Sequence, residues 1–248
     1  MYPNNPQDKM VLKCLKYHMM ADYYKYIDPA RHIHYYQKHF RCVQQLMGGM
    51  HGQRQQEPAM FRVLHASPNA PAVDVYANGN RILQNVSYKD FSDYMTVSPG
   101  RYRIDIFRSG QTVRPILSQN VTLQPATLYT VAAAGDASNL RLIPAVDNQR
   151  IEEGMTKVRF WHLSPDAPAV DIAVKGGDVL FRNISFGKTS DYLELPPTTA
   201  DLEVRIAGTK NVVKTIPDVT LRKDEAYTAA AVGFAGGSPG VEALILQP

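Results

Sequence analysis

From residue 61 to the end of the chain, apolar and polar residues alternate in short runs separated by turn-forming residues. In the first half of this region the runs are FRVLH, AVDVYA, RILQNV, DYMTV, RYRIDIFRS, ILSQNVTL, TLYTVAAA and LRLIPAV. Glycine, proline and asparagine stand between them, as in Asn78-Gly79 and Pro99-Gly100. Short alternating runs with a turn about every eight to twelve residues are typical of an antiparallel β-sandwich or barrel.

The amino-terminal residues follow a helical period instead. Apolar side chains recur there at steps of three and four, at Ile33, Tyr36, Phe40, Val43 and Met47. This spacing predicts one apolar stripe along a helix. Asp28-Pro29 is a helix start, with aspartate as the N-cap and proline at the first helical position, and Gly48-Gly49 is a stop. We therefore expect helices over 8–26 and 29–47 that form a hairpin.

The β region consists of two copies of one domain. HASPNAPAVDVY at 65–76 matches HLSPDAPAVDIA at 162–173, and two further blocks, 85–94 and 123–135, match 183–192 and 221–233 in the same order. Matching blocks at nearly constant spacing indicate an internal repeat. The predicted organisation is a helical hairpin (1–47), a linker (48–60), a first sandwich (61–148), a linker (149–157) and a second sandwich (158–248).

One local pattern narrows the fold class. The first copy carries L-x-P-x-T-x-Y-x-V from Leu123 to Val131, and the second keeps Leu221 and Tyr227. A tyrosine just inside a strand after such a corner can bond its hydroxyl back to the backbone, as in Greek-key sandwiches. We therefore expect a mainly β protein with two tandem immunoglobulin-like or fibronectin-like β-sandwich domains behind an α-helical hairpin. Any other antiparallel β fold is the alternative.

The strongest repeated motif is H-x-S-P-x-A-P-x-V-D, which begins at His65 and again at His162. With the blocks above it resembles a bacterial domain of unknown function, number 4397, over nearly all of 61–248. The resemblance implies paired β-sandwiches, often attached to exported or cell-surface proteins, and it implies no catalytic residues. This chain departs from the usual member by its helical front piece.

The motif itself permits three interpretations. Histidine, serine and aspartate within ten residues suggest a hydrolytic triad, formed by His65, Ser67 and Asp74 and again by His162, Ser164 and Asp171. No G-x-S-x-G elbow accompanies them, and recurrence in both copies favours a rigid double-proline turn capped by these side chains. The third interpretation is that the six residues line a surface that binds a ligand or partner. We expect no enzymatic activity, and a hydrolase is the alternative.

The hairpin holds both cysteines and a second candidate site. Cys14 and Cys42 each lie fourteen residues from position 28, so antiparallel helices would bring them to one level. His18 follows Cys14 by four residues and His39 precedes Cys42 by three, so each pair shares a helix face. The four side chains could converge as a tetrahedral zinc set, the two cysteines could form a disulfide, or the four could pack without any ligand.

Composition and charge limit the partners. The net charge of +4 comes from residues 1–60, where eight lysines and arginines stand against four acidic residues. The balanced β region argues against nucleic acid as a partner. The tyrosine- and methionine-rich segment 1–47 suits docking to a protein or self-association, and its composition is similar to that of spore-coat proteins. There is no recognisable signal peptide or membrane span, so we expect a cytoplasmic protein or a surface layer assembled without ordinary export.

Overall fold

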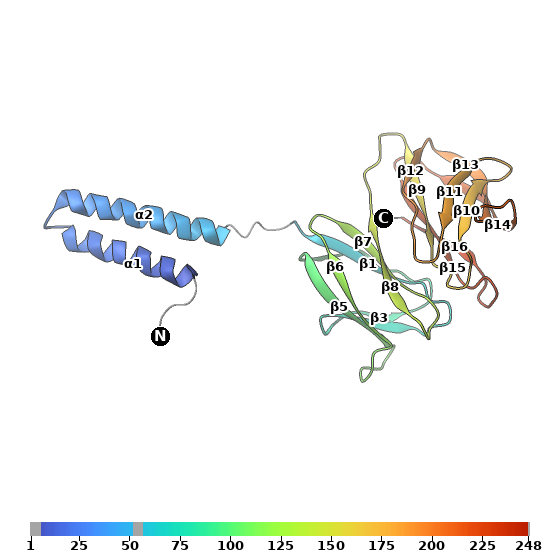
Figure 1. The fold of residues 1–248 in the computed structure, drawn as a ribbon, viewed down its shortest axis with the longest axis horizontal. Coiled ribbons are helices and arrows are strands. Elements are labelled where there is room, and N and C mark those ends of the chain that lie inside the picture. Colours follow the sequence, from blue (N-terminus) through green and yellow to red (C-terminus); the bar gives the residue numbers. More distant parts are fainter. Residues whose placement is uncertain (1–5, 52–56, 248) are drawn as a thin grey trace. The chain divides into compact units, whose positions relative to one another are not determined.

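The computed structural model describes residues 6–51 and 57–247, with side chains over 8–46 and 57–247. The chain divides into two compact units, Met1–Gln56 and Glu57–Pro248. The described residues of the first unit form two helices and those of the second form sixteen strands (Figure 1). None of the described helices is long and apolar enough to cross a membrane.

The first unit is a hairpin of α1 (Pro6–Tyr24) and α2 (Pro29–His51). Asp28 is the N-cap of α2, as expected, because its Oδ1 accepts hydrogen bonds from the backbone N–H groups of Ala30 and Arg31, both at 3.1 Å. The predicted stop at Gly48-Gly49 is wrong, since α2 continues to His51. An interior glycine weakens a helix by about 1 kcal/mol without blocking helical dihedral angles. Residues 52–56 of the expected linker lie outside the described residues.

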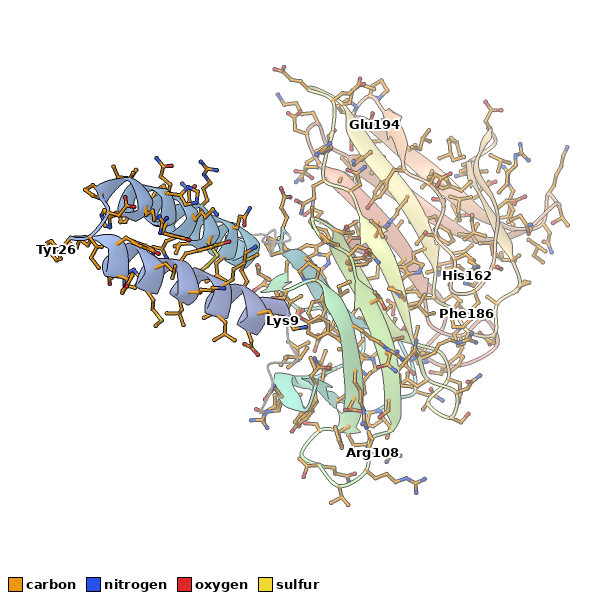
Figure 2. All side chains as sticks on the ribbon, turned by 60° about the vertical axis from the view of Figure 1, so that its left-hand side comes forward. Lys9, Tyr26, Arg108, His162, Phe186 and Glu194 are labelled. Carbon is orange, nitrogen blue, oxygen red and sulfur yellow. A yellow bond between two sulfur atoms is a disulfide. The ribbon has the colours of Figure 1, made fainter. Side chains whose placement is uncertain are left out.

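The face between the two helices is small and partly polar. Cys14, Ala21 and Cys42 are buried there, and the Nδ1–H groups of His32 and His39 donate to the backbone carbonyls of Ala21 and Cys14. The stripe expected on α2 has the predicted helical period, but it faces solvent over Ile33, Tyr36 and Phe40. Tyr26, in the turn between the helices, also points outward (Figure 2).

The first β-sandwich follows the eight runs expected from the sequence. One sheet has the order β4-β1-β7-β8 and the other β3-β2-β5-β6. The strands are β1 (Ala59–His65), β2 (Val73–Ala77), β3 (Asn80–Val86), β4 (Met95–Val97), β5 (Gly100–Arg108), β6 (Leu117–Leu123), β7 (Leu128–Ala134) and β8 (Arg141–Asp147). The second copy repeats this arrangement, with sheets β12-β9-β15-β16 and β11-β10-β13-β14. Its strands are β9 (Thr156–His162), β10 (Val170–Val174), β11 (Val179–Ile184), β12 (Leu193–Leu195), β13 (Thr198–Ile206), β14 (Val212–Leu221), β15 (Ala226–Val232) and β16 (Glu242–Leu246).

The mainly β class with two tandem sandwiches is confirmed. The two sandwiches share one strand connectivity, which differs from that of an immunoglobulin domain. β1 pairs in parallel with β7, and β9 pairs in parallel with β15. In an immunoglobulin domain the sheets have the orders ABED and CFG, so the connectivity differs within the same two-layer architecture.

Two local predictions are confirmed in detail. Asn78 and Gly79 both have positive φ, 49° and 83°, in the two-residue turn between β2 and β3. This is the geometry for which the Asn-Gly pair is selected. The hydroxyl of Tyr129 accepts a hydrogen bond from the backbone N–H of Gln124 at 3.2 Å, and that of Tyr227 accepts one from Arg222 at 3.1 Å. Both copies therefore contain the tyrosine corner.

The two sandwiches are joined by a third hydrophobic core. Side chains on one face of β1 and β7 fill the first sandwich, and those on the opposite face meet their equivalents from β9 and β15. Trp161 is fully buried in this shared core and packs with small residues such as Ala132 and Ala230. The two copies therefore meet through the outer faces of two sheets, and they do not form the end-to-end rod that two independent domains would suggest.

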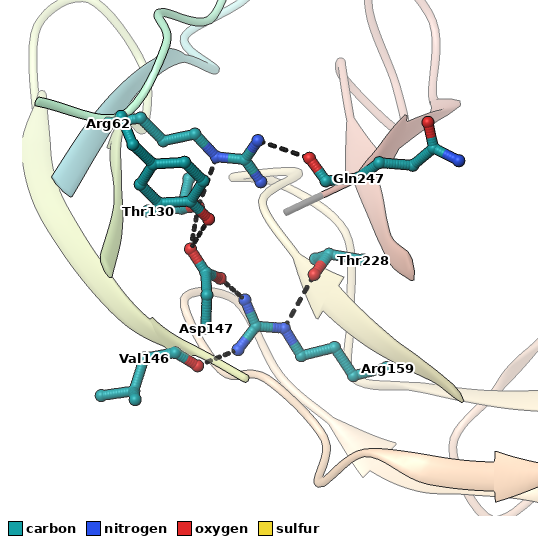
Figure 3. Close-up of polar contacts among 8 residues, drawn as sticks. Arg62, Thr130, Val146, Asp147, Arg159, Thr228 and Gln247 are labelled. Carbon is teal, nitrogen blue, oxygen red and sulfur yellow. Dashed lines mark hydrogen bonds and ion pairs between the residues drawn. The ribbon is translucent and has the colours of Figure 1, made fainter. Parts of the chain in front are cut away.

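A buried polar network runs along the edge of the shared core (Figure 3). Arg62 donates to Thr130 in its own copy and, at 2.6 Å, to the carbonyl of Gln247 in the other. Arg159 likewise donates to Thr228 in its own copy and to the carbonyl of Val146 in the other. This reciprocal exchange follows from the repeat, because the two arginines occupy equivalent positions.

Asp147 is the acidic centre of this network. Its carboxylate accepts hydrogen bonds from Tyr94 at 2.6 Å and from Thr130, both in the first copy, and forms an ion pair with Arg159 of the second. Burial, together with the bond to Asp147, raises the pKa of Tyr94 well above its usual value, so this hydroxyl keeps its proton and remains a donor. The network fixes one orientation of the two sandwiches.

Candidate functional site

Each motif histidine holds the double-proline turn that follows it. The ring Nε2–H of His65 donates to the carbonyl of Pro71 at 3.1 Å, and that of His162 donates to Pro168 at 3.0 Å. A carbonyl can only accept, so Nε2 carries the proton. Both rings are buried, and burial lowers the pKa of each below 6.5. The two histidines are therefore neutral at pH 7, and each holds its turn by a hydrogen bond.

The motif serine and the residue two positions after it connect this turn to the loop after β7 or β15. Ser67 donates to the carbonyl of Gly135 at 2.7 Å. Asn69 accepts from the backbone N–H of Ala137 and donates to Asp136. In the second copy Asp166 takes over this connection, since its carboxylate accepts the backbone N–H groups of Ala235 and Gly236 at 2.7 and 3.0 Å.

The motif aspartate ties its own strand to the next strand and to a turn. Asp74, on β2, accepts the backbone N–H of Asn85 at 2.8 Å and that of Gly110 at 3.2 Å. The bond from Asn85 is the main cause that lowers the pKa of Asp74 below its usual value. Asp171 makes the equivalent bonds to Asn183 and to Gly208. Asn85 and Asn183 have positive φ, 54° and 52°, which explains why an asparagine recurs there.

These bonds leave the proposed triad unformed. In the described part of both copies, no hydrogen bond joins the motif histidine, serine and aspartate to one another. Histidine and aspartate are each bonded to backbone groups, and serine is bonded to Gly135 in the first copy and to Asp166 in the second. A general base must lie within hydrogen-bond reach of its nucleophile and must itself be oriented by a third group. The arrangement supports a scaffold role for the motif.

A hollow lies beside the motif in the second copy. It has a volume of about 390 Å³, and His162 and Ser164 line it whereas Asp171 does not. Lys214 stands at its rim, opposite Val204 in the β13–β14 pair. Leu117 occupies the equivalent place in the first copy and packs on the core of that sandwich. Two of the residues expected to bind a ligand, His162 and Ser164, thus lie beside an open space in the second copy.

The cysteines of the hairpin are in the oxidised form, which is one of the three alternatives left open by the sequence. Cys14 and Cys42 are joined by a disulfide, with their Cα atoms 5.4 Å apart. The rings of His18 and His39 lie next to each other, with centroids 4.8 Å apart. In this state the described part of the chain has no group of three or more His, Cys, Asp or Glu side chains placed to hold a metal ion.

Two sets of structurally important side chains were not predicted from the sequence. The buried network of Arg62, Arg159 and Asp147 was one, and Asn69 with its counterpart Asp166 was the other. A signal for the arginines existed, because each stands at the same place in an otherwise apolar strand, F-R-V-L-H and V-R-F-W-H. No such signal pointed to Asp147, the last residue of β8, a strand in which buried and exposed positions are mixed.

The buried histidines predict an acid-sensitive fold. An unfolded histidine takes up a proton near pH 6.5, whereas His65 and His162 do so only at lower pH. The unfolded state therefore binds more protons, and the free energy of unfolding should fall as the pH drops below about 6.5, by at most about 1.4 kcal/mol per pH unit for each ring. Urea titrations at pH 7, 6 and 5, followed by Trp161 fluorescence, measure this slope.

The control for this experiment is an exposed histidine. The double variant His65→Gln, His162→Gln should be less stable at pH 7 and should lose less stability between pH 7 and 5. His34→Gln, on the exposed surface of α2, should keep the slope of the parent chain. Equal slopes for the parent and the double variant would contradict the assignment of the acid sensitivity to these rings.

Comparison with known proteins gives a family and two distant solved structures. No curated protein matches the sequence. The TIE protein of Bacillus anthracis is similar at 8% identity and a TM-score of 0.24, over 72% of this chain and 34% of that one. This chain thus spans about a third of the length of that protein. A Bacteroides fragilis protein described as a candidate for cell adhesion is similar at 8% identity and a TM-score of 0.21, over 77% and 98% of the two chains.

The family assignment agrees with the repeat seen in the sequence and in the strands. The model of one family matches twice, over residues 59–173 and 170–247, and its description is "Domain of unknown function (DUF4397)". The two matches cover both sandwiches and leave out the helical hairpin. The chain therefore belongs to the DUF4397 family and carries two copies of its domain in tandem.

Proposed function

We propose that this protein is a non-enzymatic structural or binding protein, in which the double sandwich is a rigid body and the helical hairpin is the element that associates. The observation that carries the proposal is the exposed apolar surface of the hairpin. Leu12, Leu15, Met19 and Tyr23 form one row on α1, and their side chains are between 52% and 69% exposed. A surface of this kind on a small unit is typical of an interface.

The occupant proposed for this surface is a second copy of the hairpin. The exposed row on α1 and the one on α2, which consists of Ile33, Tyr36 and Phe40, both step by three and four residues. Two hairpins that pack these rows together would form a four-helix bundle with an apolar core. Aromatic and methionine side chains such as Met19 and Phe40 are also enriched in interfaces between proteins.

The double sandwich supports the other half of the proposal. The shared core and the reciprocal arginine contacts give the two copies one fixed orientation, as a spacer requires. The motif histidines, aspartates and Ser67 are hydrogen-bonded to backbone groups and Ser164 to the carboxylate of Asp166, which favours scaffold over catalysis. The disulfide between Cys14 and Cys42 suits an oxidising environment, so the proposed setting is a bacterial surface layer rather than the cytoplasm.

The experiment is a measurement of mass in solution by light scattering on the full chain. The parent is expected to be a dimer or larger at tens of micromolar, and Phe40→Glu or Met19→Glu should shift it to the monomer, because a charge in the bundle core is costly. Helix content by circular dichroism should stay unchanged, since both side chains are exposed.

Gln45→Glu is the matched control, because Gln45 is exposed on the same helix as Phe40 but, five residues further on, lies on a different face from the row. It should leave the oligomer intact. A parent chain that is monomeric up to about 100 µM, well above the affinity range of stable dimers, would contradict self-association and would point to a different partner for the same surface.

A further inference from the structure

The four cysteine and histidine side chains of the hairpin lie at two adjacent levels. Cys14 and Cys42 are at one level, joined by their sulfurs. His18 and His39 are at the next level toward the turn, with their rings in contact. The two pairs therefore occupy neighbouring levels of the face between α1 and α2. Two sulfurs and two imidazoles are a complete set of ligands for tetrahedral zinc.

The hydrogen bonds of the two histidines orient them as metal ligands are oriented. Nδ1 of His39 lies 3.0 Å from the backbone carbonyl of Cys14 and donates to it, which leaves Nε2 with its lone pair free to bind. Nε2 of His18 lies 3.5 Å from the carboxylate of Asp22, one turn further along α1. A histidine that binds zinc almost always gives its other ring nitrogen to a carbonyl or a carboxylate.

His32 shows by contrast what a purely structural histidine does on the same helix. Its Nδ1–H donates to the carbonyl of Ala21 at 2.8 Å, so it ties α2 to α1 in the same way as His39. It stands two turns away from His39 along α2, nearer the turn and farther from the cysteines. The hairpin therefore contains its own matched control for a metal site.

We propose that reduction of the Cys14–Cys42 disulfide converts this cluster into a zinc site with Cys14, Cys42, His18 and His39 as its four ligands. A dithiol reductant supplies two electrons and two protons, the disulfide becomes two thiols, and the reductant becomes its own disulfide. Binding of Zn²⁺ then releases the two thiol protons. Coordination requires the sulfurs to separate to the spacing of two ligands at about 2.3 Å from one metal, and the two imidazoles to turn toward the same point.

This conversion gives the hairpin two alternative links between α1 and α2. The disulfide holds α1 and α2 together where the surroundings are oxidising, and zinc holds them where the surroundings are reducing. The interior of the hairpin is otherwise small, with Cys14, Ala21 and Cys42 as its buried apolar side chains within the described residues. A link between the helices in both states keeps the exposed rows of the two helices in place.

The test uses the full chain, reduced with a phosphine and kept from air, with Zn²⁺ alone and Co²⁺ alone as probes. The reduced chain is expected to bind one equivalent of zinc. Its cobalt form should show the visible bands of a tetrahedral ion and a thiolate charge-transfer band. The oxidised chain should bind neither metal tightly. If reduction lowers the helix content by circular dichroism, one equivalent of zinc should restore it.

Variants assign the ligands. His18→Ala and His39→Ala should each weaken zinc binding by at least about tenfold, because loss of a mere orienting group already costs that much, and both should still form the disulfide. His32→Ala should leave zinc affinity unchanged. A reduced chain that binds no zinc, or binding that survives the loss of both His18 and His39, would overturn the proposal. Neither result depends on the oligomeric state.

Discussion

Asp147→Asn should lower the free energy of unfolding of the double sandwich by about 3–5 kcal/mol. The side chain of Asp147 is fully buried and that of its partner Arg159 is only 3% exposed. Without the carboxylate, the guanidinium stays in the shared core without a counter-charge. Removal of one partner from a buried ion pair is far more costly than removal of the pair. Urea unfolding followed by Trp161 fluorescence measures the loss.

Two controls make this result specific to burial. Asp201→Asn removes the carboxylate of an exposed pair, with side-chain exposures of 57% for Lys175 and 36% for Asp201, and should cost far less than Asp147→Asn. The double variant Asp147→Asn, Arg159→Met should recover part of the loss, since it leaves no unpaired charge. A loss below about 1 kcal/mol for Asp147→Asn alone would mean that the pair is no stronger than one on the surface.

Trp161→Ala should cost about 3–5 kcal/mol, because it opens a cavity in the core that the two copies share. The indole is fully buried and packs against side chains from both sandwiches. We also expect the two copies to unfold in one transition in the parent chain and in separate transitions in Trp161→Ala, since their contact depends on this core. Far-ultraviolet circular dichroism during urea unfolding reports both effects and does not need the tryptophan.

Trp161→Leu is the matched variant, because Leu64 occupies the equivalent position in the first copy. It should cost less than alanine and should preserve a single transition. Val113→Ala, at a side chain that is 97% exposed, should change stability by less than about 0.5 kcal/mol. If Trp161→Ala kept the parent stability, the shared core would not be what joins the copies.

The candidate sites could be predicted from the sequence only as sets of residues. The distance of Cys14 and Cys42 from the turn placed them at one level, and the structure confirms that they meet, because helical rise depends on residue count alone. Which chemistry joins them depends on redox state, which no spacing records. The His, Ser and Asp of the motif were found as a group, but their bonding partners lie in other strands and loops, at Gly135, Asn85 and Gly110.

The sequence by itself determined the strands, the turns, the repeat and the hairpin of this protein, because alternation, helical period and turn chemistry act over a few neighbouring residues. The tertiary structure alone decided which faces became buried. Arg62 and Arg159 read as solvent-facing positions in their strands, yet both lie in the interface between the copies. Ile33, Tyr36 and Phe40 read as a stripe to be covered, yet they are exposed. The burial of a face depends on what packs against it, and that partner lies far away in the sequence.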